Sequence, residues 1–325
     1  MNRRDCLRAA GLLASVALLP AACSTDSLRG SAAVGPGQRR CSGAIGVQLF
    51  AVRDMLIADP RGALAKLGEV GFREVELFGF EDNVFIDDPL FGLSATEFRD
   101  ALESAGLSAP IAHVSGAFED ISEVAGIASS LGVMTLINPM APEFLTVRDG
   151  QAIVSGVSGR DQMMGLASRL NAQGRECERN GLGFGYHNHH MEFEPLGDRP
   201  AFDFLAENTD PALVKFELDV GWVAVSGRDP VDYIDRYHDR IIAVHMKDYD
   251  PSLPIGTDPK TYPIPEQAQL VEPGAGSIDF ERIVEALEKY EICHRFVEVD
   301  VTTEPIETVE RGYNYLANLG SRRTD

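Results

Sequence analysis

The stretch GFGYHNHHMEF at residues 183–193 begins as a short apolar run of strand character and ends in a cluster of polar side chains. It holds His187, His189 and His190, three of the seven histidines in the chain. Residues two apart on a strand face the same way, so His187 and His189 share one face. Imidazole is the commonest metal ligand and exchanges protons near neutral pH. The stretch indicates either a functional site at a strand end or a polar loop with ordinary hydrogen bonds, and the rest of the chain decides between them.

This stretch belongs to one of eight β-rich runs that alternate with helical stretches. The runs are Ile45–Phe50, Glu74–Phe78, Ser108–Val114, Val133–Asn138, Gly183–Asn188, Val214–Val220, Ile241–Lys247 and Phe296–Asp300. The stretches between them are amphipathic; Leu64, Leu67 and Val70, for example, form an apolar stripe that ends at Gly71. Strict alternation predicts a parallel sheet with helices outside it. Eight units in about 280 residues predict an α/β fold of one domain, a (β/α)8 TIM barrel, and no Rossmann G-x-G-x-x-G follows the first run.

Ionisable side chains stand at the carboxyl ends of six of the eight runs. Asp219 ends the sixth run, with Glu217 two residues earlier on the same face, and His245 and Lys247 share a face of the seventh. Glu298 stands between valines in the eighth run, where an unpaired buried charge is costly. The other residues at strand ends are Glu76, His113, His187 and His189. These ends meet at one mouth in a barrel, so we expect the residues to form one site.

This donor set indicates a divalent metal. Asp, Glu and His without cysteine suit Mn, Co, Mg or Zn, and the five cysteines form no C-x-x-C pair and indicate no disulfide framework. Such an ion acts as a Lewis acid on sugar oxygens. Simpler roles stay open, with Asp219 as a helix cap or loop ion pair, Lys247 as an ion-pair partner and Trp222 as a core residue.

Four motifs resemble those of the xylose isomerase-like barrel family of sugar (phosphate) isomerases and epimerases. They are YHNHHMEF at 186–193, LDVGW at 218–222, VHMKD at 244–248 and EPGAGSIDF at 272–280. The resemblance covers most of residues 44–325, which we expect to form the barrel. It implies a metal at the ends of strands five to eight, held by His187, Asp219, His245 and Glu298.

The fifth strand departs from the pattern of the family's sugar epimerases. Those enzymes typically carry a glutamate where this chain has His187, and they use two glutamates to move protons. Relatives with a His-Asn-His pattern include proteins that act on 3-keto sugars by elimination or hydration. The resemblance therefore implies proton abstraction at a metal site and leaves the reaction type open.

Three functions fit these residues. The first is a metal-dependent sugar isomerase or epimerase, in which Glu298 or Lys247 removes a proton next to a carbonyl to give a metal-stabilised enediolate. The second is a 3-keto-glycoside lyase or hydratase at the same metal site, and the third is a non-catalytic, tethered sugar-binding protein. In each, the partner is a small-molecule carbohydrate. The residues expected to contact it are Glu76, His113, His189, Glu192 and Trp222.

The N-terminal residues 1–23 have the features of an export signal. Arg3 and Arg4 resemble a twin-arginine motif, although Cys6 stands where Phe is usual, and residues 9–19 form an apolar run too short to span a bilayer. The residues before Cys23 resemble a lipoprotein cleavage box, with Pro20 where Leu is expected. Residues 24–43 read as a flexible linker. We expect export to the periplasm, with membrane attachment only through a lipid anchor at Cys23.

The charge of the chain argues against nucleic-acid partners. The formal charge is −21, and loss of residues 1–23, which carry a net charge of +2, leaves −23. Such a surface repels phosphate backbones, which disfavours a metal-dependent DNA-repair endonuclease on a related barrel. The sequence does not indicate an oligomeric state.

Overall fold

The computed structural model describes residues 44–79, 88–115, 121–148, 151–257 and 264–321. The expected export signal (1–23) and linker (24–43) lie outside these residues. All described residues belong to one compact unit, which spans residues 40–325. No helix within the described residues is long and apolar enough to cross a membrane.

Eight parallel strands close into a barrel, which confirms the predicted fold class. Each strand pairs with the next one along the chain, and the first pairs with the last. The strands are β1 Gly46–Gln48, β2 Glu74–Leu77, β3 Ser108–His113, β4 Thr135–Asn138, β7 Gly183–His187, β10 Lys215–Asp219, β11 Ile241–Met246 and β14 His294–Val297. All eight fall on predicted runs, but β14 begins and ends earlier than the predicted Phe296–Asp300. Glu298 therefore lies just beyond its strand.

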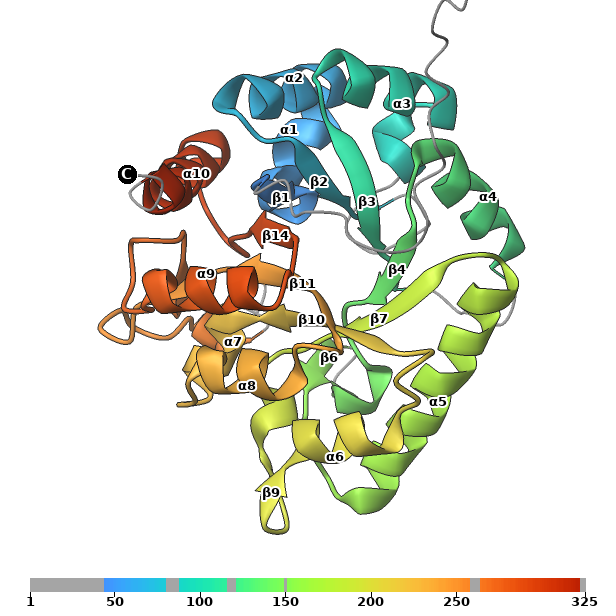
Figure 1. Ribbon diagram of the computed structural model, residues 1–325, viewed down its shortest axis with the longest axis vertical. Coiled ribbons are helices and arrows are strands. Elements are labelled where there is room, and N and C mark those ends of the chain that lie inside the picture. The colour runs from blue at the N-terminus through green and yellow to red at the C-terminus, as the bar shows by residue number, and fades with distance from the viewer. Residues whose placement is uncertain (1–43, 80–87, 116–120, 149–150, 258–263, 322–325) are drawn as a thin grey trace, which may run out of the picture. The chain divides into compact units, whose positions relative to one another are not determined.

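Helices surround the strands as an outer ring (Figure 1). They are α1 Arg53–Ala58, α2 Pro60–Val70, α3 Ala95–Ser104, α4 Ser122–Leu131, α5 Arg160–Arg179, α6 Ala201–Asn208, α7 Val220–Val225, α8 Pro230–Tyr237, α9 Phe280–Lys289 and α10 Pro305–Ser321. Local signals set their ends: Ser94 and Glu97 form a capping box at the start of α3, and Gly71 ends α2 with a φ of 122°.

The barrel interior is filled in layers because successive inward-facing residues lie two apart on each strand. One layer is apolar and consists of Ile111, Ile137, Ala243 and Phe296. Gly46 makes room for it, since a Cβ there would lie 2.5 Å from the Phe296 ring, and Gly185 does the same for Ile137. Two residues further along the same strands come His113, His245 and, beyond β14, Glu298. The apolar layer thus supports a polar layer nearer the carboxyl ends.

Two long connections on the face where the strands end each contain a pair of short antiparallel strands. After β4, β5 Leu145–Arg148 pairs with β6 Gln151–Val154; after β11, β12 Asp248–Tyr249 pairs with β13 Leu270–Val271. Asp248 anchors the second connection, because its carboxylate accepts hydrogen bonds from the backbone N–H groups of Gly274, Gly276 and Ile278. Ile264 and Leu270 from that connection pack on Trp222.

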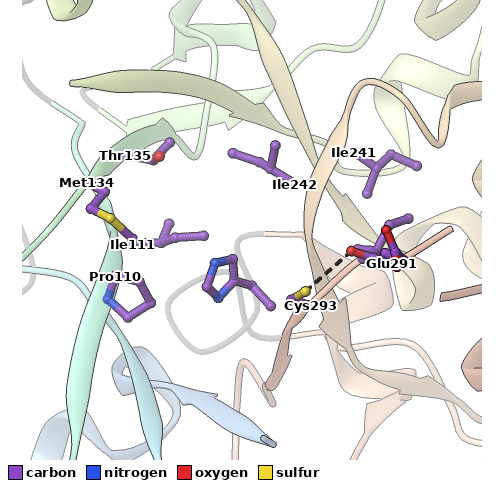
Figure 2. A pocket seen from close by; sticks show the side chains of 10 residues that line it. Pro110, Ile111, Met134, Thr135, Ile241, Ile242, Glu291 and Cys293 are labelled. Carbon is purple, nitrogen blue, oxygen red and sulfur yellow. Dashed lines mark hydrogen bonds between the residues drawn. The ribbon is translucent and has the colours of Figure 1, made fainter. Parts of the chain in front are cut away.

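A shallow pocket of about 300 Å³ lies at the opposite end of the barrel, where strands begin (Figure 2). Pro110, Thr135, Ile241 and Cys293 line it, each at or next to the start of its strand. Cys293 is disulfide-bonded, which the cysteine spacing did not predict. Barrel enzymes carry their active sites at the other face, so this pocket is not the candidate site.

Candidate metal centre

Three ligand-type side chains converge at the carboxyl ends of β10, β11 and β14. One ligand atom each from Asp219, His245 and Glu298 lies within 4.8 Å of the others, and all three residues are buried. Nδ1 of His245 is 2.7 Å from Oε2 of Glu298 and 3.8 Å from Oδ2 of Asp219. Nε2 of His187 is also 3.8 Å from Oδ2 of Asp219. The structure thus brings together the four residues that the sequence suggested as metal ligands.

Asp219 serves both as a helix cap and as a site residue. Its Oδ1 accepts a hydrogen bond from the backbone N–H of Trp222 at 3.0 Å and caps α7. Its Oδ2 faces the converging ligands and Nζ of Lys247, which is 3.1 Å away. Burial raises the pKa of Asp219 to about 6, while Lys247 opposes that shift. The cap and ion-pair roles left open for this residue coexist with a place among the ligands.

A second group lies among the same residues and is centred on Glu217. Ligand atoms of His113, His187, Glu217 and His245 lie within 4.8 Å of one another. Oε2 of Glu217 is 2.7 Å from Nε2 of His113, and 3.2 Å from both Nδ1 of His187 and Nε2 of His245. The sequence placed Glu217 on the face of Asp219 but gave it no role.

Glu76 joins this inner group from the other side of the barrel. It is fully buried, its Oε2 lies 2.5 Å from Nε2 of His245, and it accepts a hydrogen bond from Gln48 at 2.7 Å. Its Oε1 is 3.3 Å from Nε2 of His113. Glu76 and His113, both expected to contact substrate, therefore lie within the carboxylate and imidazole network. Their contact with a sugar remains a prediction.

Lys247 contributes a buried ammonium to the site. Its Nζ is 2.8 Å from Asp300, 2.9 Å from Glu298 and 3.1 Å from Asp219. Burial opposes its charge, yet the three carboxylates raise the pKa of Lys247 well above its ordinary value. If the predicted eighth run continued as a strand to Asp300, alternation would turn this residue towards the helices. Because β14 ends at Val297, alternation no longer applies, and Asp300 faces the site instead.

The protonation states of the remaining groups follow from burial and neighbouring charge. Burial lowers the pKa of His187 to about 3, so its imidazole is neutral. Burial alone would lower the pKa of His245 and raise that of Glu298. The surrounding carboxylates instead raise the pKa of His245 well above its ordinary value, and Lys247 and His245 hold that of Glu298 well below. A cation bound at His245 displaces its proton.

His189 and Trp222 lie beside the ligand group. The ring of Trp222 is fully buried, 5.4 Å from the ring of His189 and 5.6 Å from Nζ of Lys247. Burial lowers the pKa of His189 well below its ordinary value, and its Nδ1 is buried without a hydrogen-bond partner. Both residues are placed at the site, and their substrate contacts remain predictions.

Glu192 is the predicted site residue whose carboxylate is committed elsewhere. It is fully buried, accepts a hydrogen bond from the Tyr186 hydroxyl and accepts another from the backbone N–H of His189 at 2.9 Å. This pair of bonds ties the loop after β7 back to its own strand. The proposed substrate contact of Glu192 would have to compete with both bonds.

Unsatisfied buried atoms show whether the residues fit a metal. Oδ2 of Asp219, Nδ1 of His245 and Oε2 of Glu298 are buried without an aligned hydrogen bond, and they are the atoms that converge. Buried polar atoms normally make aligned hydrogen bonds, so three ligand atoms that have charged neighbours but no aligned hydrogen bond, and that face one point, fit a bound cation. Two carboxylates with imidazole form the nitrogen and oxygen donor set of Mn, Co, Mg or Zn.

A closed parallel barrel with such a ligand cluster at its carboxyl face is the architecture of barrel metalloenzymes. The chain belongs to the xylose isomerase-like TIM barrel family, whose model matches residues 64–319. The resemblance found in the sequence motifs is thereby confirmed at the level of the family.

Curated relatives are enzymes of the lyase type. An inosose dehydratase of Clostridium beijerinckii is 32% identical over 127 residues, which are 38% of this chain and 42% of that protein. The chain thus matches less than half the length of this relative.

Solved structures show the same fold. A sugar phosphate isomerase/epimerase of Parabacteroides distasonis has a TM-score of 0.65 at 20% identity, covering 88% of this chain and 96% of that one. The probable 3-DHS dehydratase of Bacillus anthracis involved in petrobactin synthesis has a TM-score of 0.61 at 16% identity. The match covers 85% of this chain and 99% of that one.

Proposed function

We propose that the chain is a divalent-metal-dependent lyase that removes water from a keto sugar or keto cyclitol. The observation that carries this proposal is the pair formed by Glu298 and Lys247, whose charged atoms are 2.9 Å apart beside the candidate ligands. The pKa of Lys247 is raised well above its ordinary value and that of Glu298 is held well below its own, so Lys247 carries a proton to give and Glu298 is ionised and can take one. One acid and one base stand side by side.

The residues of this chain can account for each proton in an elimination. Glu298 takes the proton from the carbon next to the substrate carbonyl, and the released electron pair forms a carbon–carbon double bond. The carbon–oxygen bond at the next carbon breaks, and Lys247 gives its proton to the departing hydroxide, which leaves as water. Asp219 and Asp300 keep the Lys247 ammonium in place during these transfers.

His187, Asp219, His245 and Glu298 would hold the cation. When bound there, a divalent cation polarises the substrate carbonyl and makes the neighbouring C–H more acidic. The neutral imidazole of His187 and the orphaned atoms of the other three support this ligand set.

The adjacent acid and base also support a second candidate, isomerisation between neighbouring carbons. The same pair would then move a proton from one carbon to the next without loss of water. Epimerisation by two glutamates on opposite faces has less support, because His187 stands at the fifth strand in place of the second glutamate. The dehydratase names among curated relatives favour elimination.

The substrate proposed is unphosphorylated. The Lys247 ammonium is engaged by three carboxylates, so it is not free to bind a phosphate. The inner groups are carboxylates, imidazoles and the amide of Gln48, which suit hydroxyl groups and protons.

The test is elemental analysis of the purified protein followed by NMR in D₂O with inosose, 3-keto glycosides and free ketoses. We expect a bound divalent metal, and loss of water from one of the keto substrates. Deuterium next to the carbonyl without loss of water would instead establish isomerisation. Protein without metal that neither exchanges nor eliminates would overturn both reactions and leave a sugar-binding role.

A further inference from the structure

One oxygen of Glu217 lies among three imidazole rings. The residue is fully buried on β10, two residues before Asp219. Its Oε2 is 2.7 Å from His113 and 3.2 Å from each of His187 and His245. A buried carboxylate is normally satisfied by specific donors, and ring N–H groups are the donors within reach.

The ring nitrogens that face Glu217 are not those that face the candidate cation. His187 turns Nδ1 to Glu217 and Nε2 to Asp219. His245 turns Nε2 to Glu217 and Nδ1 to Asp219 and Glu298. An imidazole that binds metal through one nitrogen typically donates its other N–H to a carboxylate, which fixes both the tautomer and the ring orientation.

We propose that Glu217 is a positioning residue that holds His187, and shares with Glu76 the hold on His245, through the ring nitrogens that face away from the candidate cation. The inference rests on the metal site of the proposed function. Among the residues that the structure describes, Glu217 is the hydrogen-bond partner of Nδ1 of His187, whereas Nε2 of His245 also lies 2.5 Å from Oε2 of Glu76. Loss of Glu217 therefore frees the ring of His187 more than that of His245.

The inner group offers one competing arrangement, in which a cation is bound by His113, His187, Glu217 and His245 themselves. That arrangement uses the nitrogens that face Glu217 and leaves unexplained why Nδ1 of His245 converges with the oxygens of Asp219 and Glu298. The positioning role accounts for both sets of nitrogens with one cation.

The test compares metal binding by the mature wild-type chain and Glu217→Gln. An amide keeps one acceptor oxygen but loses the negative charge that faces three imidazoles, so the variant should bind Co²⁺ or Zn²⁺ about 10–100-fold more weakly in a chelator competition. The visible absorption of bound Co²⁺ should also shift, because the ring of His187 is no longer fixed. A loss of fold alone would not alter that spectrum in protein that still binds.

Two further variants separate the explanations. Glu143→Gln removes a partly buried carboxylate that binds Arg169 on α5 and lies outside the candidate site, and its metal affinity should match the wild type. Glu217→Asp keeps the charge but moves the carboxylate oxygen away from the imidazole rings. Its metal affinity should lie between those of Glu217→Gln and the wild type. It provides the test if Glu217→Gln does not fold.

Three outcomes are decisive. Wild-type affinity and an unchanged Co²⁺ spectrum in Glu217→Gln would overturn the positioning role while leaving the metal site intact. Two ions per wild-type chain, with one lost in His113→Ala, would replace it with an inner metal site. A wild-type chain that binds no divalent metal would overturn this role together with the proposed function.

Discussion

At the scale of single residues, the two oxygens of Asp219 have separable tasks. Asp219→Asn keeps an oxygen that can accept from the backbone N–H of Trp222 but removes the charge that faces the cation. We expect loss of metal with the fold retained, because Lys247 stays paired with Glu298 and Asp300. Asp219→Ala should lose the metal and also cost about 1 kcal/mol more in free energy of unfolding, since the helix cap goes as well.

Elemental analysis and urea unfolding of both variants check this. Metal fully retained in Asp219→Asn would show that the ligand set is wrong. Equal unfolding free energies for the Asn and Ala variants would show that the cap contributes nothing.

Glu192 predicts a pH dependence of stability. Burial raises its pKa from an ordinary 4.5 to about 7. Between these values the folded protein binds a proton that the unfolded chain does not, so this contribution to stability is present at low pH and is lost as pH rises through 7. Glu192→Gln has no proton to lose; its amide oxygen can accept from the backbone N–H of His189 while its NH2 donates to the Tyr186 hydroxyl oxygen. It should be more stable than wild type at pH 8 by up to about 3 kcal/mol.

Urea unfolding at pH 5 and pH 8 tests the sign. The difference between variant and wild type should be larger at pH 8. A difference that does not change between the two pH values would mean that Glu192 titrates normally in the folded protein.

The sequence was informative about the outer residues of the site and less so about the inner ones. Asp219, His245 and Glu298 stand at recognisable strand ends, so their convergence follows once the barrel is accepted. The contact between Glu76 and His245 does not follow, because it crosses the barrel between residues 169 positions apart. Strand alternation shows which way a side chain faces, but barrel closure decides which partner it meets.

At the scale of elements, glycines inside the barrel set how the strands pack. A Cβ on Gly185 of β7 would lie 2.5 Å from Cδ1 of Ile137 on β4. Gly185→Ala should therefore cost about 1–3 kcal/mol in free energy of unfolding through overpacking. Ile137→Val removes the Cδ1 atom and by itself should cost about 1 kcal/mol. The double variant should be more stable than the sum of the two effects predicts, since the clash is gone.

A double-mutant cycle by urea unfolding measures this coupling. Strictly additive effects would show that Gly185 is required for another reason, such as the approach of the Lys215 carbonyl at 3.4 Å from the same Cβ position.

Element boundaries explain where the sequence-based prediction failed. The central residues of each strand were identified because buried parallel strands are apolar and β-branched. The eighth strand was placed two residues too late at its start, since the valines on both sides of Glu298 continue the pattern beyond the last ladder residue, Val297. That error turned Asp300 away from Lys247, and the structure reverses it.

At the scale of the whole molecule, the net charge of the chain and its expected location both bear on which partners it can meet. A chain that carries −21, or −23 after the proposed loss of residues 1–23, is poorly suited to bind nucleic acids, and this charge says little about a small neutral substrate. The location of the chain is a prediction from residues 1–23.

We propose that the twin-arginine motif exports the folded barrel and that Cys23 becomes its first residue. Replacing Arg3 and Arg4 together by lysine should keep the protein in the cytosol, because the export receptor reads the arginine pair itself. Cys23→Ser should leave export intact but release the protein from membranes, since a lipid on that thiol is the only attachment proposed. Cell fractionation and intact mass of the processed chain distinguish these results. An unprocessed wild-type chain found in the cytosol would contradict export, and a processed chain of unmodified mass in the soluble periplasmic fraction would contradict the lipid anchor alone.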